Sequence, residues 1–122
     1  MKVMIVDDSK SMRMIVKRTL KQAGFDTMEF EEAEDGTDAL AKIDDYMPQL
    51  VLCDWNMPEM NGIDFLKAIR AAGNTVKFGF VTTESTAEMR AEAKAAGAQF
   101  LIAKPFTAET FEKTLQPVLR QP

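Results

Sequence analysis

The sequence predicts an α/β protein in which helices cover both faces of a parallel sheet. Five short strand-like segments, most of them apolar and β-branched, alternate along the chain with five segments whose apolar residues recur at helical spacing. A chain that alternates strand and helix in this way builds parallel strands through right-handed crossovers. The length of 122 residues, with 46% hydrophobic and 28% charged residues, predicts one globular domain over residues 1–122.

The first strand and helix are the most clearly marked. Residues 2–6 predict a strand, and the uninterrupted apolar run within it, Val3 to Val6, is typical of a strand buried on both faces. The next segment has helical periodicity. Ser9 or Asp8 can cap its start, and Gly24 stands where a left-handed residue ends a helix. Residues 28–33 predict a weaker second strand.

The middle of the chain repeats the pattern. A turn at 35–36 precedes a short helix from residue 37 to about 45. Residues 50–53 predict a buried strand, and a loop rich in turn residues leads to a helix that ends at Gly73.

The fourth strand is predicted over 76–82, with four of its side chains on one face. Gly79 lies on the other face, which indicates a helix packed closely against it. The stretch from Ser85 to Glu88 has the pattern of a capping box and predicts a helix that runs to Gly97.

The last strand is predicted over 100–103. Thr107 can cap the final helix, and we expect that helix to end or kink near Gln116 because Pro117 cannot donate a backbone hydrogen bond.

Composition narrows the possible functions. The net charge of −4 argues against non-specific binding to nucleic acid or to an anionic membrane. The chain has no His, which excludes His-based acid–base catalysis and most zinc sites. A single Cys53 and the lack of a long apolar run fit a protein of the cytoplasm.

Polar residues gather where the predicted strands end. Asp7 and Asp8 follow the first strand and Asp54 follows the third, while Thr82 and Lys104 close the fourth and fifth. Ligands of open α/β sheets bind at this edge. Three carboxylates together repel one another unless a cation joins them, and their hard oxygens suit Mg²⁺. A carboxylate there can also take a phosphoryl group as an acyl phosphate.

Each of these residues alone has an ordinary interpretation as a helix cap, a turn former, a strand residue or a surface charge. Their arrival at one edge favours a shared site. The chain resembles the receiver domain of two-component response regulators, most closely its single-domain chemotaxis members. The resemblance spans nearly the whole chain and rests on five matching stretches: residues 6–9 with Met12-Arg13, 32–36 with 38–40, 54–58 with 60–62, Val81-Thr82, and 104–107.

The resemblance implies a flavodoxin-like (βα)5 fold with strand order 2-1-3-4-5 and no attached output domain. It implies that Asp54 is the phosphoacceptor, that Lys104 pairs with the phosphoryl group and that Thr82 acts as the switch. It implies Mg²⁺ held by Asp7, Asp8 and Asp54 and by the backbone carbonyl of Asn56. The Lys104-Pro105 bond is a candidate for the cis form.

The same resemblance implies the partners. A sensor histidine kinase would donate the phosphoryl group. A surface made by the fourth helix, fifth strand and fifth helix would bind a target such as a component of the flagellar motor switch, and a phosphatase would be a further partner. Such a protein is a switch rather than an enzyme, with catalysis limited to its own phosphorylation and dephosphorylation. Asn56 and Glu84 match residue types that tune dephosphorylation, so we expect a short-lived phosphoryl state.

Two departures from the family pattern stand out. Relatives usually carry Tyr or Phe three residues before the conserved Lys, where this chain has Leu101. Its aromatic residue is Phe100, which a strand directs to the opposite face. The residue after the switch Thr is usually small, and here it is Thr83. We also expect Trp55, beside the acceptor, to be partly exposed.

Alternatives remain open from sequence alone. The output could be a phosphorelay or the control of another enzyme instead of a motor. A Mg²⁺-dependent phosphatase with an aspartyl nucleophile would need an Asp-x-Asp motif after the first strand, and here that place reads Asp7-Asp8-Ser9. A receiver that works as a constitutive binding module would not need the intact site residues.

Overall fold

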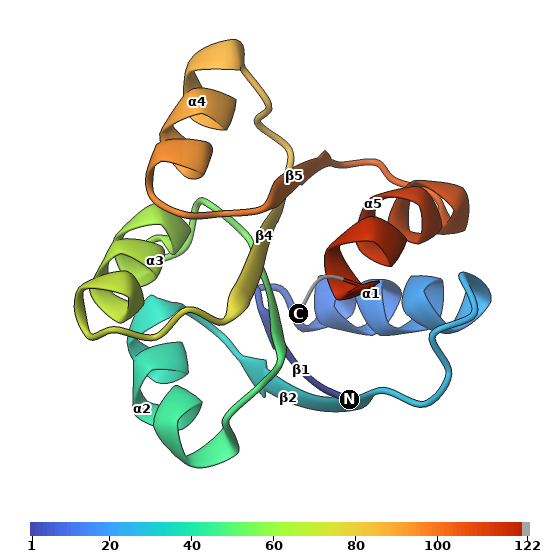
Figure 1. The fold of residues 1–122 in the computed structure, drawn as a ribbon, viewed down its shortest axis with the longest axis horizontal. Helices are drawn as coiled ribbons and strands as arrows, with labels where there is room; N and C mark the ends of the chain where they lie inside the picture. Colours follow the sequence, from blue (N-terminus) through green and yellow to red (C-terminus); the bar gives the residue numbers. More distant parts are fainter. Residues whose placement is uncertain (121–122) are drawn as a thin grey trace.

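The computed structural model describes residues 1–120 and contains one five-stranded parallel sheet (Figure 1). The strand order is β2-β1-β3-β4-β5, with every neighbouring pair parallel. The predicted fold is therefore confirmed. The strands are β1 (Lys2–Val6), β2 (Glu29–Ala33), β3 (Leu50–Cys53), β4 (Lys77–Thr82) and β5 (Phe100–Ala103).

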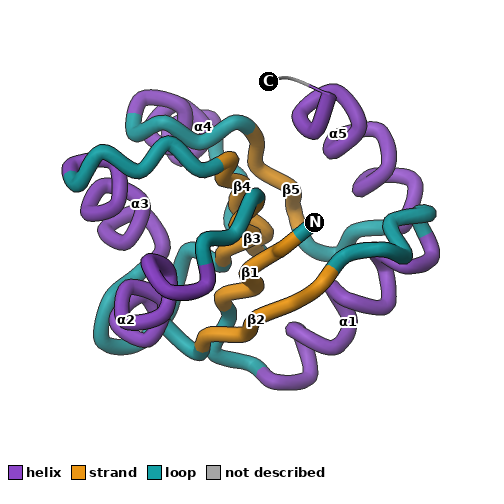
Figure 2. The backbone as a smooth tube through the Cα atoms, turned by 60° about the horizontal axis from the view of Figure 1, so that its bottom comes forward, coloured by secondary structure: helices purple, strands orange, loops and turns teal. Residues whose placement is uncertain are grey.

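The helices cover both faces of this sheet, as Figure 2 shows. On one face lie α2, α3 and α4, and on the other lie α1 and α5. No helix within residues 1–120 is long and apolar enough to cross a membrane. The helices are α1 (Lys10–Gln22), α2 (Gly36–Tyr46), α3 (Gly62–Ala71), α4 (Ala87–Ala95) and α5 (Ala108–Arg120).

The alternation of side chains along β1 divides the core into two clusters. Met4 and Val6 pack with the helices α2, α3 and α4, whereas Val3 and Ile5 pack with α1 and α5. All four side chains are essentially inaccessible to solvent. A strand that is apolar at successive positions therefore belongs in the interior of a three-layer structure, and its carboxyl end is held rigidly.

Caps set most helix starts. Ser9 caps α1, where its hydroxyl accepts the Met12 N–H, and Gly24 follows the helix with φ +98°, as expected. The capping box predicted from Ser85 is wrong by one residue. Thr86 is the cap of α4 and accepts the Met89 N–H, because its hydroxyl lies three residues before that donor.

Two other expected boundaries are wrong. The turn predicted at Asp35-Gly36 is the start of α2, because Asp35 caps the helix by accepting the Asp38 N–H and Gly36 is its first residue. The end expected near Gln116 is absent, since α5 runs through Pro117 to Arg120. Pro117 is exposed near the end of that helix, where few turns follow the position that lacks a backbone N–H donor.

Gly79 is packed against a side chain of the next strand, not against a helix as expected. Gly79 and Phe100 are register partners in the β4–β5 pair, and a methyl group added to Gly79 would overlap the Phe100 ring. The ring therefore occupies the space that a side chain at residue 79 would need.

Candidate phosphoryl and metal site

The acidic cluster is built by the neighbouring carboxyl ends of β1 and β3. The last paired residues are Val6 and Cys53, and the Asp54 N–H donates to the Val6 carbonyl at 2.8 Å. Asp7 and Asp54 therefore leave the sheet side by side. The two strands are buried along their length, which holds these backbones in place.

Three carboxylates meet at this point. One carboxylate oxygen from each of Asp7, Asp8 and Asp54 lies within 4.8 Å of the others. Asp7 is buried, Asp54 is half-buried and Asp8 is exposed, so the cluster opens to solvent on one side. Hard oxygen donors that are partly open to water fit Mg²⁺, which keeps some of its hydration shell.

Lys104 brings a cation to the same cluster from the end of β5. Its Nζ lies 3.0 Å from Asp7 Oδ2 and 3.5 Å from Asp54 Oδ2, and its side chain is only 11% exposed. The Lys104 N–H donates to the Thr82 carbonyl, which ties this residue to the end of β4. The peptide bond between Lys104 and Pro105 is cis, as expected.

The electrostatics of Asp54 disfavour its charge. Burial raises the pKa of this carboxyl above its usual value, and the negative charge of Asp7 raises it further. The positive charge of Lys104 is the main opposing effect, helped by the Trp55 N–H, which donates to Asp54 Oδ1 at 2.7 Å. One lysine serves two carboxylates here, so the site holds a deficit of positive charge.

Thr82 and Asn56 flank the carboxylate cluster on its two sides. Thr82 is fully buried at the end of β4, and its hydroxyl lies near enough to Asp54 to lower the pKa of that carboxyl. Asn56 is exposed and its side-chain amide donates to Glu84 at 3.0 Å. A hydrogen bond therefore joins the two loops that follow β3 and β4.

Trp55 is more buried than the sequence suggested. Its residue surface is 7% exposed, and its ring packs on Phe80 with 4.7 Å between ring centroids. The expectation of partial exposure is wrong because the loop turns this side chain inward onto the aromatic core of β4. The indole of the residue that follows Asp54 therefore lies in a packed aromatic environment.

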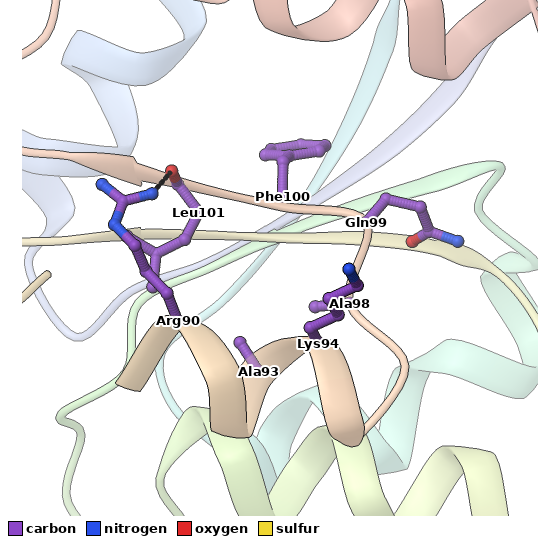
Figure 3. Close-up of a pocket in the computed structure, with 7 residues that line it drawn as sticks. All are labelled: Arg90, Ala93, Lys94, Ala98, Gln99, Phe100 and Leu101. Carbon is purple, nitrogen blue, oxygen red and sulfur yellow. Dashed lines mark hydrogen bonds between the residues drawn. The ribbon is translucent and has the colours of Figure 1, made fainter. Parts of the chain in front are cut away.

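Residues 100 and 101 lie on opposite faces of β5, as the one-residue offset predicts. Phe100 belongs to the cluster with α1 and α5, while Leu101 packs toward α4. Figure 3 shows Phe100 directed away from Arg90, and the Arg90 guanidinium donating to the Leu101 carbonyl at 3.2 Å. A groove of about 430 Å³ lies between α4 and β5; its lining includes Arg90, Lys94 and Leu101.

The sequence argument gave no role to Arg13 and Glu32, although the structure places them beside the site. The Arg13 guanidinium donates to the Asp7 carbonyl and forms an ion pair with Glu32 at 2.7 Å. Lys17, one helical turn after Arg13, occupies the other oxygen of Glu32 at 2.6 Å. The sequence signals for this pair are that both residues lie in the stretches that match the receiver family and that two basic residues stand four apart on a predicted helix.

Comparison with known proteins agrees with this geometry. Residues 3–116 match the family model described as the response regulator receiver domain. The chemotaxis protein CheY1 of Helicobacter pylori is 38% identical, and the aligned region covers 98% of this chain and 97% of CheY1. The chemotaxis protein CheY-3 of Vibrio cholerae is 41% identical, and the aligned region covers 99% of this chain and 93% of CheY-3. The solved structure of CheY4 of Vibrio cholerae, 42% identical, superposes with a TM-score of 0.84 over 96% of this chain and 97% of its own.

Proposed function

Because this chain belongs to the response regulator receiver domains of two-component signalling, we propose that it is a switch controlled by phosphorylation of Asp54. The observation that carries the proposal is the placement of Asp54 between the Lys104 ammonium and two further carboxylates. A nucleophilic carboxylate needs positioning and charge neutralisation for phosphoryl transfer, and this arrangement supplies both once a divalent cation is bound.

The donor in this proposal is the phosphohistidine of a sensor histidine kinase. An Asp54 carboxylate oxygen forms a bond to phosphorus while the phosphorus–nitrogen bond to the donor breaks, and the imidazole nitrogen takes up a proton. Water later cleaves the acyl phosphate to the carboxylate and inorganic phosphate. Lys104 pairs with the phosphoryl oxygens, and the Thr82 hydroxyl donates to one of them.

The residues for the metal in this proposal are Asp7, Asp8 and Asp54, with the backbone carbonyl of Asn56. Receiver domains generally bind Mg²⁺ at an acidic pocket, and the cluster here has the oxygen donors and partial exposure that suit this ion. When bound, Mg²⁺ supplies charge neutralisation for the phosphoryl oxygens.

The output in this proposal is binding through the surface made by α4, β5 and α5, whose state depends on the Thr82 and Lys104 ends of β4 and β5. Relatives named as chemotaxis proteins favour a component of the flagellar motor as the target. A target in a phosphorelay, or another enzyme, is the second candidate, favoured by Leu101 where an aromatic is usual. A phosphatase that removes the phosphoryl group is a further proposed partner.

The direct test is phosphorylation by acetyl phosphate with Mg²⁺, followed by mass spectrometry of the intact protein. We expect a gain of one phosphoryl group in the wild type and none in Asp54→Asn. The control Asp26→Asn removes an exposed aspartate far along the chain and should be modified as the wild type is. Failure of the wild type to be modified would favour a constitutive binding module.

Two further measurements separate the alternatives. Continuous turnover of a phosphomonoester would indicate a phosphatase. Affinity capture from lysate with beryllofluoride-activated wild type, compared with Asp54→Asn, would identify the target, which should be retained only by the activated protein. Retention of a flagellar motor component supports the motor as the target, and retention of a different protein supports the second candidate instead.

A further inference from the structure

The Arg13 side chain joins three elements around the acidic cluster. From the second turn of α1, its Nη1 donates to the Asp7 carbonyl at 2.5 Å and its Nε pairs with Glu32 of β2 at 2.7 Å. Its side chain is 13% exposed. An ordinary surface ion pair is different, as the pair of Lys113 and Glu109 shows with exposures of 75% and 71%. Arg13 therefore has a fixed place with two separate hydrogen bonds.

The Asp7 carbonyl belongs to the peptide group that joins Asp7 to Asp8. This group is planar, so a hydrogen bond to its oxygen fixes the plane from which the Asp8 residue projects. Asp7 is held further by its own carboxylate, which accepts the Ser9 N–H at 2.9 Å and the Lys104 ammonium at 3.0 Å. Within residues 1–120 the Asp8 side chain has no hydrogen-bond or ion-pair partner, so its direction depends on the backbone alone.

Glu32 fixes the orientation of the guanidinium. One Glu32 oxygen accepts from Arg13 and the other from Lys17 at 2.6 Å, while the Glu32 backbone carbonyl accepts from Lys42 at 2.8 Å. The hydrogen bond from Lys17, and then that from Arg13, lower the pKa of Glu32, which stays an anion and keeps the fork of Arg13 in one direction. The chain of contacts thus runs from β2 through Arg13 to the peptide before Asp8.

We propose that Arg13 is a positioning residue that, held by Glu32, aims the Asp8 carboxylate at the divalent cation of the acidic cluster. This inference rests on the proposed function, since it assumes that the cluster binds Mg²⁺. Mutation of a residue that hydrogen-bonds to a metal ligand and orients it commonly weakens metal binding by one to two orders of magnitude. Lysine cannot replace it, because an ammonium is a point charge without the planar fork.

Charge and positioning make opposite predictions for this residue. Arg13 is a cation beside a cation site, so its positive charge alone opposes Mg²⁺ binding, and its removal would tighten that binding. Loss of positioning weakens binding. Arg13→Lys keeps the charge and removes the fork, so it isolates the positioning effect. The control Arg18→Lys makes the same change at an exposed position of α1.

The experiment is a calorimetric titration of the full chain with MgCl₂, without any phosphoryl donor. We expect Arg13→Lys to weaken Mg²⁺ binding about tenfold or more, Glu32→Gln to weaken it by a smaller factor in the same direction, and Arg18→Lys to bind as the wild type does. Urea unfolding in EDTA establishes that each variant is folded under the titration conditions. A merely structural role would shift the unfolding midpoint and leave the affinity of the folded protein unchanged.

The outcomes separate this inference from the proposed function. Equal Mg²⁺ affinity in Arg13→Lys and the wild type overturns the positioning role and leaves the metal site in place. Tighter binding in Arg13→Lys overturns it as well. Absence of Mg²⁺ binding by the wild type overturns both. Should Arg13→Lys fail to fold, Glu32→Gln decides, because an unchanged affinity there shows that the orientation of the guanidinium has no effect on the site.

Discussion

Asp54→Asn should make the metal-free protein more stable, although it removes the residue on which the proposed function depends. In the structure, carboxylate oxygens of Asp7 and Asp8 each lie within 4.8 Å of one from Asp54. At an effective dielectric constant of 20, a like-charge pair at this distance costs about 3.5 kcal/mol, and Lys104, 3.5 Å from Asp54, returns about 5 kcal/mol on the same scale. Asp8 is exposed, so solvent screens its repulsion, and the attraction by Lys104 comes close to cancelling the repulsion by the two carboxylates.

Burial of the Asp54 carboxylate is the largest cause of its raised pKa and decides the sign. We therefore expect Asp54→Asn to raise the free energy of unfolding by about 1–2 kcal/mol at pH 7 in EDTA, the scale on which replacing an incompletely compensated buried charge stabilises a protein. The attraction between Lys104 and Asp7 survives the change, and the Asn oxygen can still accept the Trp55 N–H. In urea, the unfolding midpoint should rise by about 0.5 M or more.

The pH dependence of the free energy of unfolding is a second test of the direction of this stability change. A carboxyl whose pKa is raised by folding contributes its full stability below its unfolded pKa and loses it as the pH rises through the folded value. The wild type therefore gains stability relative to Asp54→Asn on acidification, and the advantage of the variant should shrink toward zero below about pH 4.

Mg²⁺ should reverse the order of stability. A ligand that binds only the folded state at a hundred times its dissociation constant adds about 2.7 kcal/mol. The wild type has all three carboxylates and should gain more than the variant. Circular dichroism during urea unfolding measures the stability of the wild type and of Asp54→Asn, each with and without Mg²⁺. Asp26→Asn is the control for loss of one negative charge. A variant less stable than the wild type in EDTA, or an advantage that grows on acidification, would refute this reasoning.

Three further predictions concern the scaffold. Gly79→Ala should cost about 1–3 kcal/mol in urea unfolding because its methyl group overlaps the Phe100 ring, and adding Phe100→Ala should remove that overlap cost, seen as positive coupling in a double-mutant cycle. Thr86→Ala should cost about 1 kcal/mol, whereas Ser85→Ala should change stability by less than about 0.5 kcal/mol; equal costs would contradict the assigned cap. Glu32→Gln should lose about 0.5–1 kcal/mol at pH 7, because a lowered pKa stabilises the fold above the unfolded value, and this loss should vanish as the pH falls through the lowered pKa.

The sheet and the acidic edge were predictable because they depend on patterns that are local in sequence. Apolar runs of four residues mark β1, β3 and β5, and a polar residue immediately after each run lies at the common edge of a parallel sheet. The sequence therefore predicts that Asp7, Asp54 and Lys104 lie together. Two of the helix caps, Ser9 and Thr107, follow from the same local logic, since each hydroxyl accepts the backbone N–H three residues later.

The sequence could not predict what depends on pairing between distant segments. Thr86 and Ser85 are equally good caps in isolation, and only the direction of the chain leaving β4 decides between them. Gly79 looks like a site for a helix until the register of β5 places Phe100 beside it. Arg13 is one of several basic residues on α1. It is 19 residues from Glu32 in sequence, and the two meet only because β1 pairs with β2.

The aromatic residue of β5 is at position 100 instead of 101, and this position affects how the proposed switch can work. Phe100 fills the space above Gly79 on the α1 and α5 face, so its ring cannot follow Thr82 on the opposite face. What connects the site to α4 is the backbone. Thr82 is paired with Ala103 and accepts the Lys104 N–H, while the carbonyl of Leu101, two residues before Ala103, accepts from Arg90 of α4. We therefore expect a displacement of Thr82 to reach α4 along β5, through the Arg90 guanidinium and the packing of Leu101, in place of the rotation of an aromatic ring.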